Sequence, residues 1–345
     1  MLRHLLRSLS LALLAILILA IAWGGMEYHR FTTTPLNTGS SNMSYEVAPG
    51  MTLKKIAHDL QQRGVLSHAS YLVWLSYLQD KGRNVRAGEY TLAPGTTPSQ
   101  LLDQLASDKV IEYALTLVEG WTFRQLMDAI DRHEKLSHTL SGLDEREIMA
   151  KLGFAGQHPE GRFYPDTYHF PKGTTDVAFL QRAYRAMDQR LQQEWQKRSA
   201  GLPLRTPDEA LTLASIVERE TGLASERPLI AGVFVRRLLI GMPLQTDPTV
   251  IYGLGPSFDG NLRRRDLESD TPYNTYMHTG LPPTPIAMPG IDAIHAVLHP
   301  APGDALYFVA RGDGGHVFSA TLEQHNRAVV KYQLGGTRRA TEAQQ

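Results

Sequence analysis

An apolar run near the N-terminus places the strongest constraint on this chain, because such a run must enter a lipid bilayer or be removed. Residues 9–23 contain one polar side chain, Ser10, and follow two arginines, Arg3 and Arg7. At about 1.5 Å rise per residue, a helix over residues 5–26 is long enough to cross a bilayer. Basic residues before a span favour a cytoplasmic N-terminus. We therefore predict a single-pass inner-membrane anchor over residues 1–26, with the remaining chain in the periplasm.

A cleaved signal peptide is the alternative interpretation of the same segment. Ala20-Ile21-Ala22 has the small-x-small pattern of a cleavage site, and the purely apolar run is short. We favour the uncleaved anchor. Both interpretations export the rest of the chain.

The composition fits exported globular domains and argues against nucleic-acid binding. The chain has 345 residues and 42% hydrophobic content, enough for two domains with separate cores. Basic and acidic residues number 35 each, so there is no surplus of cations to neutralise phosphates. The absence of cysteine excludes disulfides, thiolate metal sites and thiol nucleophiles.

Two small regions are predicted between the anchor and the main domain. Residues 27–44 are rich in threonine, serine, asparagine and glycine, which predicts a flexible tether. Residues 45–110 contain two strand–turn–helix patterns with Pro-Gly turns at 49–50 and 94–95, each followed by a threonine suited to cap a helix. With a further strand at 88–92, this region resembles a LysM-like β-α-α-β module.

The remaining chain predicts a larger mixed α+β domain over residues 111–335 and a disordered tail over 336–345. A charge-rich helix over 176–198 indicates a mainly solvated face. Near the C-terminus, apolar residues 306–310 and 316–319 flank a glycine-rich turn, which predicts a β-hairpin. The predicted fold class is thus α+β with an N-terminal transmembrane helix.

One helix in this domain has clear boundaries in the sequence. Thr206 suits an N-cap, Pro207 the first helical position and Glu209 a capping box, while Gly222 suits the C-terminal end. The segment from Leu213 to Glu218 is almost entirely apolar before it reaches the glutamate. We therefore predict a helix that carries an acidic group near its C-terminus.

Glu218 is the predicted proton donor of a carbohydrate-cleaving site. It shares a helical face with Leu211 and Ala214 and lies near the negative end of the helix dipole. Burial and the dipole both disfavour the ionised carboxylate, which raises its pKa. Glu220 points to another face, and periodicity alone does not decide which of the two is the acid.

Downstream, polar and aromatic residues cluster at 245–253 and 273–276. Their hydroxyl groups and rings suit sugar binding, although tyrosines and an asparagine also pack loops. Asp247 and Asp166 each suit a turn cap equally well, and His316 suits a hairpin position. The sequence contains no nucleophile-elbow, Walker or dinucleotide motif, and no pair of its histidines forms an HExxH motif, so no metal or cofactor is expected.

Several motifs in one order resemble the YceG-like (MltG) endolytic murein transglycosylases, over residues 45–335. They are Ala-Ser-Ile-Val-Glu ending at Glu218, Gln245-Thr246-Asp247-Pro248, Tyr273-Asn274-Thr275-Tyr276, Gly280-Leu281-Pro282-Pro283, and the stretches 160–168 and 315–319. The chain departs from the expected pattern at Met288, where an asparagine is expected, and at Gln324, where a glutamate is expected.

The resemblance implies a lyase that cuts nascent peptidoglycan strands and ends their elongation. Glu218 would protonate the β-1,4 bond between N-acetylmuramic acid and N-acetylglucosamine, then take the proton of the muramyl C6 hydroxyl, which closes a 1,6-anhydro ring. Peptidoglycan synthases are implied as partners. The predicted substrate-binding residues are Glu160, Asp166, Tyr168, Gln245, Thr246, Asp247, Tyr252, Tyr273, Asn274, Thr275, Tyr276 and His316.

Two alternatives remain open at this stage. A hydrolytic muramidase would pair Glu218 with a second carboxylate, for which Asp166, Asp247 and Glu160 are candidates. A non-catalytic peptidoglycan-binding scaffold would use the same cleft without turnover. The muramidase would form a different product from the lyase, and the scaffold would form no product.

Overall fold

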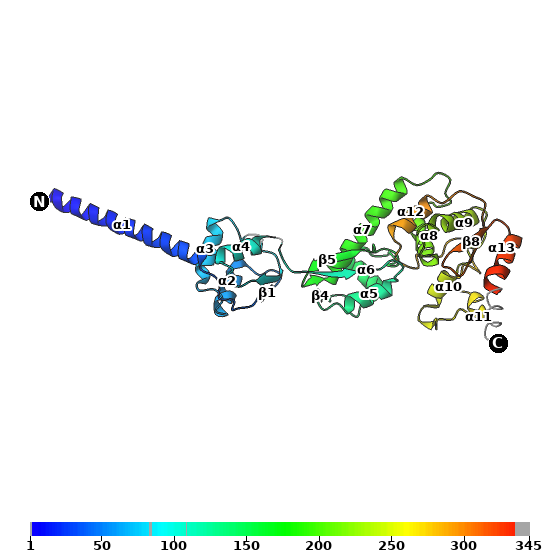
Figure 1. Ribbon diagram of the computed structural model, residues 1–345, viewed down its shortest axis with the longest axis horizontal. Helices are drawn as coiled ribbons and strands as arrows, with labels where there is room; N and C mark the ends of the chain where they lie inside the picture. The colour runs from blue at the N-terminus through cyan, green and yellow to red at the C-terminus, as the bar shows by residue number, and fades with distance from the viewer. Residues whose placement is uncertain (1, 83–84, 108, 335–345) are drawn as a thin grey trace. The chain divides into compact units, whose positions relative to one another are not determined.

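The computed structural model describes residues 2–82, 85–107 and 109–334 of a mixed α+β protein (Figure 1). The chain divides into two compact units. Unit 1 comprises Met1–Ala114 with His169–Thr174, and unit 2 comprises Leu115–Tyr168 with Thr175–Gln345. The predicted α+β class is confirmed. The tail predicted at 336–345 lies outside the described residues.

Helix α1, Leu2–Thr33, contains the predicted anchor. Its part from Leu9 to Thr33 is long and apolar enough to cross a membrane, and the most apolar window is not buried by the rest of the chain. The helix continues well into the segment predicted to be a tether.

The structure departs from the predicted flexible tether over 27–44 in part of this segment. Residues up to Thr33 are helical, and Phe31 and Leu36 are buried in the core of unit 1. The Leu36 amide donates to Thr96 O at 2.7 Å and the Asn37 amide to Val65 O at 3.0 Å. Phe31 and Leu36 attach the segment to the core of unit 1. The mainly polar composition of the segment gave no indication of this burial.

Unit 1 has the predicted β-α-α-β order. It contains β1 (Met43–Val47), α2 (Leu53–Gln62), α3 (Ala69–Leu78), β2 (Gly88–Leu92) and α4 (Pro98–Ala106). β1 and β2 pair antiparallel with Tyr45 opposite Tyr90, and both tyrosines are buried. The helices cover these side chains with Ile56, Leu60 and Leu101. The specific likeness to LysM remains a prediction.

The two Pro-Gly turns of unit 1 form as predicted. Gly50 and Gly95 adopt φ of 77° and 87°, the left-handed conformation that such turns require. Thr52 and Thr97 then accept hydrogen bonds from amides in the first turns of α2 and α4.

The chain passes between the units within two paired strands, β3 (Glu112–Thr116) and β5 (Thr167–Pro171). The elements between and just after these two strands are two short helices, one long helix and two short strands. The short helices are α5 (Phe123–Asp131) and α6 (Glu145–Leu152), the long helix is α7 (Asp176–Gln196), and the short strands are β4 (Leu136–Ser137) and β6 (Thr174–Thr175). One face of α7 is buried and the other is exposed.

The core of unit 2 is helical. Helices α8 (Pro207–Glu220), α9 (Arg227–Leu239) and α12 (Ile291–Leu298) pack together, and α7 packs on α8 and α12. The remaining elements are α10 (Asp247–Leu254), η1 (Gly255–Ser257), α11 (Arg264–Leu267), β7 (Tyr307–Ala310), β8 (His316–Ser319), α13 (Leu322–Val329) and η2 (Val330–Leu334). The predicted hairpin is confirmed, with Ala310 opposite His316.

Helix α8 begins as predicted and ends earlier. The Thr206 hydroxyl accepts from the Glu209 amide at 3.2 Å, but the Glu209 carboxylate accepts from Arg205 N instead of closing a capping box. Thr221 is extended, with φ −146° and ψ 136°, so Gly222 does not form the end of the helix. Because the Thr221 hydroxyl accepts from the Leu223 amide, a side-chain turn replaces the expected glycine turn.

Candidate active site

Glu218 lies in a network of buried charges. Its Oε1 accepts from Arg227 Nη2 at 3.0 Å and its Oε2 from the Gly290 amide at 2.9 Å. Its side chain is 5% exposed and that of Arg227 is 9% exposed. Burial raises the pKa of Glu218, while Gly290 and Arg227 oppose the shift. Both carboxylate oxygens are thus held by protein groups.

Arg227 joins Glu218 to two further carboxylates. Its Nη2 lies 3.6 Å from Glu119 Oε2, and its Nη1 donates to Asp292 Oδ2 at 3.3 Å. A Cβ at Gly290, the N-cap of α12, would lie 1.9 Å from Glu119 Oε1, so a side chain there would require the exposed Glu119 carboxylate to move.

Glu220, two residues further on, faces a different environment. It lines a cavity of about 380 Å³. Its Oε1 accepts from the Thr246 hydroxyl. Burial raises the pKa of Glu220 to about 7, reinforced by Asp247 and opposed first by the Thr246 hydrogen bond and then by His316 and Arg237.

Predicted substrate-binding residues gather around this cavity. Those that line it are Gln245, Thr246, Asp247, Tyr276 and His316. The lining does not include Glu218. Residues two apart on a helix point about 200° away from each other, which places the two glutamates on different sides of α8.

The segment before α10 presents its side chains through a strained backbone. Gln245 has φ of 50°, which is unfavourable for a residue with a side chain, and its amide donates to Thr275 O at 3.0 Å. The Thr246 amide donates to the Thr275 hydroxyl at 3.1 Å. These bonds hold Thr246 beside Glu220.

Asp247 and Tyr276 form a pair at the same cavity. The Tyr276 hydroxyl donates to Asp247 Oδ1 at 2.6 Å, and burial raises the pKa of Tyr276 above its usual range. Asp247 is also the first residue of α10. Asp247 therefore lies at the start of a helix, as a capping residue does, and also lines the cavity.

His316 is fixed by a buried acid. Its Nδ1 lies 2.7 Å from Glu226 Oε2, and its amide donates to Glu226 Oε1 at 2.8 Å. Although burial raises the pKa of Glu226, these hydrogen bonds hold it below its ordinary value. The second ring nitrogen of His316 is left available to a ligand in the cavity.

The lining residues that were not predicted from the sequence include Arg237, Tyr307 and His325. Arg237 donates to Leu306 O at 2.6 Å and Leu244 O at 2.7 Å, which ties the hairpin to the segment before α10. His325 stacks on Tyr307 at 5.3 Å, and burial lowers its pKa. Within the described chain, His325 Nδ1 is buried without a hydrogen-bond partner. The one sequence signal near His325 was its neighbour Gln324, where the family pattern has a glutamate.

Asn274 and Thr275, both predicted to bind substrate, are buried and hydrogen-bonded within the protein, and their substrate contacts stay a prediction. Asn274 is fully buried and bonds within its own loop: its amide donates to Leu267 O at 3.0 Å and Ser269 O at 2.7 Å, and its Oδ1 accepts from the Tyr276 amide at 2.9 Å. Thr275 is 2% exposed and bonds Thr249 at 2.8 Å. Both shape the loop that presents Tyr276.

Glu160, Tyr252 and Tyr273 form a separate buried group. The Glu160 carboxylate accepts from the Phe123 amide at 2.9 Å and from the Tyr252 hydroxyl at 3.1 Å. Burial raises the pKa of Glu160 to about 7. The ring of Tyr273 packs edge-on against Tyr252 at 4.9 Å. Because these groups bond one another and Tyr252 and Tyr273 pack on the helical core, the packing interpretation describes them.

Asp166 and Tyr168 also lie apart from the cavity. Asp166 is exposed and accepts from the Thr167 amide at 2.8 Å, as a turn cap does. Tyr168 is 4% exposed, donates to Tyr164 O at 2.8 Å and packs edge-on against Phe179. Asp166 thus occupies a turn position and Tyr168 a core position, and their substrate contacts stay a prediction.

Comparison with known proteins agrees with this architecture. The profile of the YceG-like family matches residues 45–331. The chain is 32% identical over 335 residues to the endolytic murein transglycosylase of Bacillus subtilis strain 168, covering 90% of this chain and 91% of that protein. It is 28% identical to the endolytic murein transglycosylase of Streptococcus pneumoniae D39, covering 94% of this chain and 65% of the longer relative.

A solved structure shares the fold. The crystal structure of a yceG-like protein from Listeria monocytogenes superposes with a TM-score of 0.55 at 31% identity. The superposition covers 84% of this chain and 99% of that chain. The likeness extends over most of both proteins.

Proposed function

Because this chain belongs to the YceG-like family, we propose that it is an endolytic murein transglycosylase, a lyase that cuts glycan strands of peptidoglycan. The bond cleaved is the β-1,4 bond between N-acetylmuramic acid and N-acetylglucosamine within nascent strands. The new ends are 1,6-anhydro-N-acetylmuramic acid, and cleavage terminates strand elongation.

The observation that carries this proposal is Glu220 in its cavity. A general acid must be protonated near the working pH and open to the substrate. Glu220 meets both conditions, with a pKa of about 7 and a place in a cavity lined by hydroxyl, amide and carboxylate groups. Because burial raises the pKa of Glu218 as well, the cavity distinguishes the two glutamates, and on that ground we propose Glu220 as the acid.

Glu218, the acid predicted from the sequence, has a supporting position in this proposal. Its oxygens are occupied by Arg227 and Gly290, so a proton transfer to substrate would first require that network to open. Its effect on catalysis would be to position the end of α8. Comparison of substitutions at the two glutamates tests this assignment.

The reaction needs one acid–base group and no water. Glu220 donates its proton to the glycosidic oxygen as the bond from C1 of N-acetylmuramic acid breaks, which releases the N-acetylglucosamine hydroxyl. The C6 hydroxyl of the same N-acetylmuramic acid then forms a bond to C1, and its proton returns to Glu220. Because the nucleophile belongs to the substrate, a second catalytic carboxylate is not required.

A hydrolytic muramidase is the second candidate, and Asp247 is the observation that favours it. This carboxylate lines the same cavity as Glu220 and is held by the Tyr276 hydroxyl. In that mechanism Asp247 would activate water or attack C1, and oxygen from water would enter the product.

Digestion of purified glycan strands in ¹⁸O-labelled water tests the two candidates. The proposal predicts internal cuts, anhydro ends without label, and no such products with Glu220→Gln. Labelled reducing ends would establish the muramidase instead. A complete lack of turnover by the folded full-length protein would leave a binding scaffold and reject both enzymes.

The proposed setting is the periplasmic face of the inner membrane. Helix α1 supports single-pass anchoring because its length and apolar composition suffice to cross a bilayer. Unit 1, with its predicted LysM-like order, would bind peptidoglycan near the membrane, and synthases that supply nascent strands would be partners. Protease protection in spheroplasts tests this orientation: unit 2 is expected to be cleaved by external protease.

A further inference from the structure

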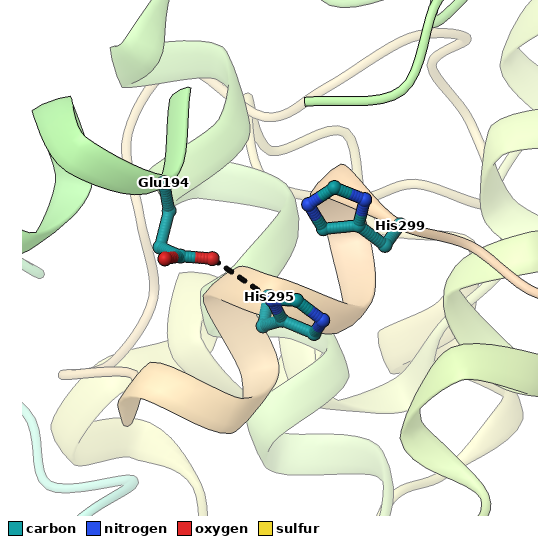
Figure 2. A group of neighbouring side chains, drawn as sticks. All are labelled: Glu194, His295 and His299. Carbon is teal, nitrogen blue, oxygen red and sulfur yellow. Dashed lines mark hydrogen bonds and ion pairs between the residues drawn. The ribbon is translucent and has the colours of Figure 1, made fainter. Parts of the chain in front are cut away.

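Folding brings Glu194 beside two histidines, His295 and His299, that lie about 100 positions further along the chain, and all three side chains are of types that bind metal ions (Figure 2). Glu194 comes from α7, whereas His295 and His299 come from the C-terminal end of α12. Their candidate ligand atoms all lie within 4.8 Å of one another. Glu194 Oε2 is 2.8 Å from His295 Nδ1, and the two imidazole rings are 4.4 Å apart.

The donor set of this cluster suits zinc. Two imidazole nitrogens and one carboxylate oxygen form a common three-ligand zinc set, with a fourth position for water. Ligand atoms around tetrahedral zinc are about 3.3 Å apart, given bonds of about 2.0–2.1 Å. The present ligand atoms, all within 4.8 Å of one another, would have to move closer together to reach this spacing, and the imidazole of His295 is 60% exposed.

Neighbouring residues orient two of the three ligands. Ser199 Oγ lies 3.3 Å from His299 Nδ1, which leaves His299 Nε2 for a metal ion. Lys197 Nζ donates to Glu194 Oε1 at 3.2 Å, which leaves Oε2 facing His295. Such outer partners fix the ring orientation and the free oxygen of metal ligands.

We propose that Glu194, His295 and His299 form a zinc-binding site that links α7 to α12. The sequence predicted no metal site because the histidines lack an HExxH motif and the glutamate lies 101 positions from His295. Both helices pack against α8, which carries Glu220. Zinc bound there stabilises the helical core of unit 2, independently of the reaction at the cavity.

The test measures zinc binding by the full-length protein in detergent, with a histidine-free affinity tag. We expect one zinc per chain in competition with a chromophoric chelator, and a rise in Tm of roughly 5 °C at a hundredfold excess over Kd. His299→Gln should abolish both effects, because it removes one ligand and preserves the Glu194–His295 pair.

A matched control is His278→Gln. His278 pairs with Asp270 at 2.8 Å and is 51% exposed, but this pair has no third ligand. The control should bind zinc as the unmodified protein does. Unchanged stoichiometry and Tm shift in His299→Gln, or no zinc binding by the unmodified protein, would overturn the proposal and leave Glu194 and His295 as an ordinary ion pair. Equal melting of all variants without zinc verifies folding.

A second inference comes from an exposed apolar face on α3 of unit 1. Leu72 and Leu75 are buried, but Trp74, Tyr77 and Leu78 are 70%, 79% and 65% exposed. A helix that is apolar on all sides is expected to be covered by protein or lipid.

The same face borders an apolar cavity of about 300 Å³ next to the membrane-spanning candidate. Its aromatic and aliphatic lining comes from both helices: Trp23, Tyr28 and Phe31 of α1, and Tyr71, Trp74 and Leu78 of α3. Phe31 packs edge-on against Tyr71 at 5.4 Å. Tryptophan and tyrosine are enriched where a protein meets the lipid–water interface.

We infer that α3 inserts its exposed face into the outer leaflet beside α1, with a phospholipid chain in this cavity. The cavity continues directly from the apolar surface of α1, and it is this continuity that identifies lipid as the occupant. The inference rests on the membrane anchoring proposed above.

Tryptophan quenching in nanodiscs of brominated phosphatidylcholine separates the two claims. In Trp23→Phe, Trp74 is the interfacial reporter, and in Trp74→Phe it is Trp23; Trp121 and Trp195 are common to both. Quenching in both proteins is expected. Quenching only in Trp74→Phe would retain the anchor and overturn the docking of α3, and quenching in neither would overturn both.

Discussion

Glu218 and Glu220 end the same helix, yet their carboxylates have different partners. Glu218 is bound by Arg227 and the Gly290 amide, whereas Glu220 is bound by Thr246 and lines the cavity. The 200° angle between residues two apart on a helix places the two carboxylates in different surroundings, and we propose that the one at the cavity is the acid. Most of the predictions below depend on this separation.

Glu220→Gln should lower the turnover rate by roughly 10²- to 10⁴-fold, the usual contribution of a general acid. Glutamine keeps the size and can still bond Thr246, so Tm should change little. The measurement is the rate of anhydro-end formation on purified strands. The comparison variant is Glu218→Gln, assayed at a temperature where it stays folded. A larger loss of rate in Glu218→Gln than in Glu220→Gln would show that Glu218 is the acid.

The pH dependence of the rate should follow the ionisation of Glu220. With a pKa of about 7, the protonated fraction falls tenfold per pH unit well above that value. Turnover at saturating substrate should therefore decline on the alkaline side of neutrality. A rate that is flat from pH 6 to 9 would contradict the assignment.

The ionisation of Glu220 should also make the stability of the folded protein depend on pH. The folded pKa of Glu220 is raised above its ordinary value of 4.5, so between about pH 4.5 and 7 the folded chain binds more protons than the unfolded chain. Its stability then falls as pH rises through that window, by about 3 kcal/mol in total for a shift of this size. Glu220→Gln should gain on the unmodified protein over the same window in urea unfolding curves.

Local sequence patterns predicted the elements of this fold well. Thr52, Thr97 and Thr206 cap helices as expected, because capping depends on neighbours within three residues. The structure departs from the predicted tether because burial of Phe31 and Leu36 depends on partners distant in sequence. Local periodicity cannot report such contacts.

The candidate site was predicted only in part, because it too depends on contacts between residues that are distant in sequence. The motif at 245–247 with Tyr276 and His316 does converge on one cavity. Asn274 and Tyr168 do not line that cavity, since a polar or aromatic residue in a motif supports a loop as readily as it binds a sugar. The choice between Glu218 and Glu220 required the positions of Arg227 and Thr246, which no spacing rule gives.

Arg227→Met should destabilise unit 2 by about 3–5 kcal/mol, because it leaves Glu218 buried without its cation. The double variant Arg227→Met/Glu218→Gln should recover part of this loss, since the uncompensated charge is removed as well. Urea unfolding of the two singles and the double gives the coupling energy. Additive effects would indicate that the pair does not interact in solution.

Asn274→Ala should lower stability without removing a substrate contact. The substitution leaves Leu267 O, Ser269 O and the Tyr276 amide without their buried partner, at a cost of about 2–3 kcal/mol. Asn261→Ala, at an exposed position of the same segment, is the control and should change stability by less than about 0.5 kcal/mol. Because the amide of Asn274 is consumed by its loop, KM for glycan strands should stay near that of the unmodified protein below the unfolding temperature. A large rise in KM at unchanged stability would instead restore Asn274 as a reader of the N-acetyl group.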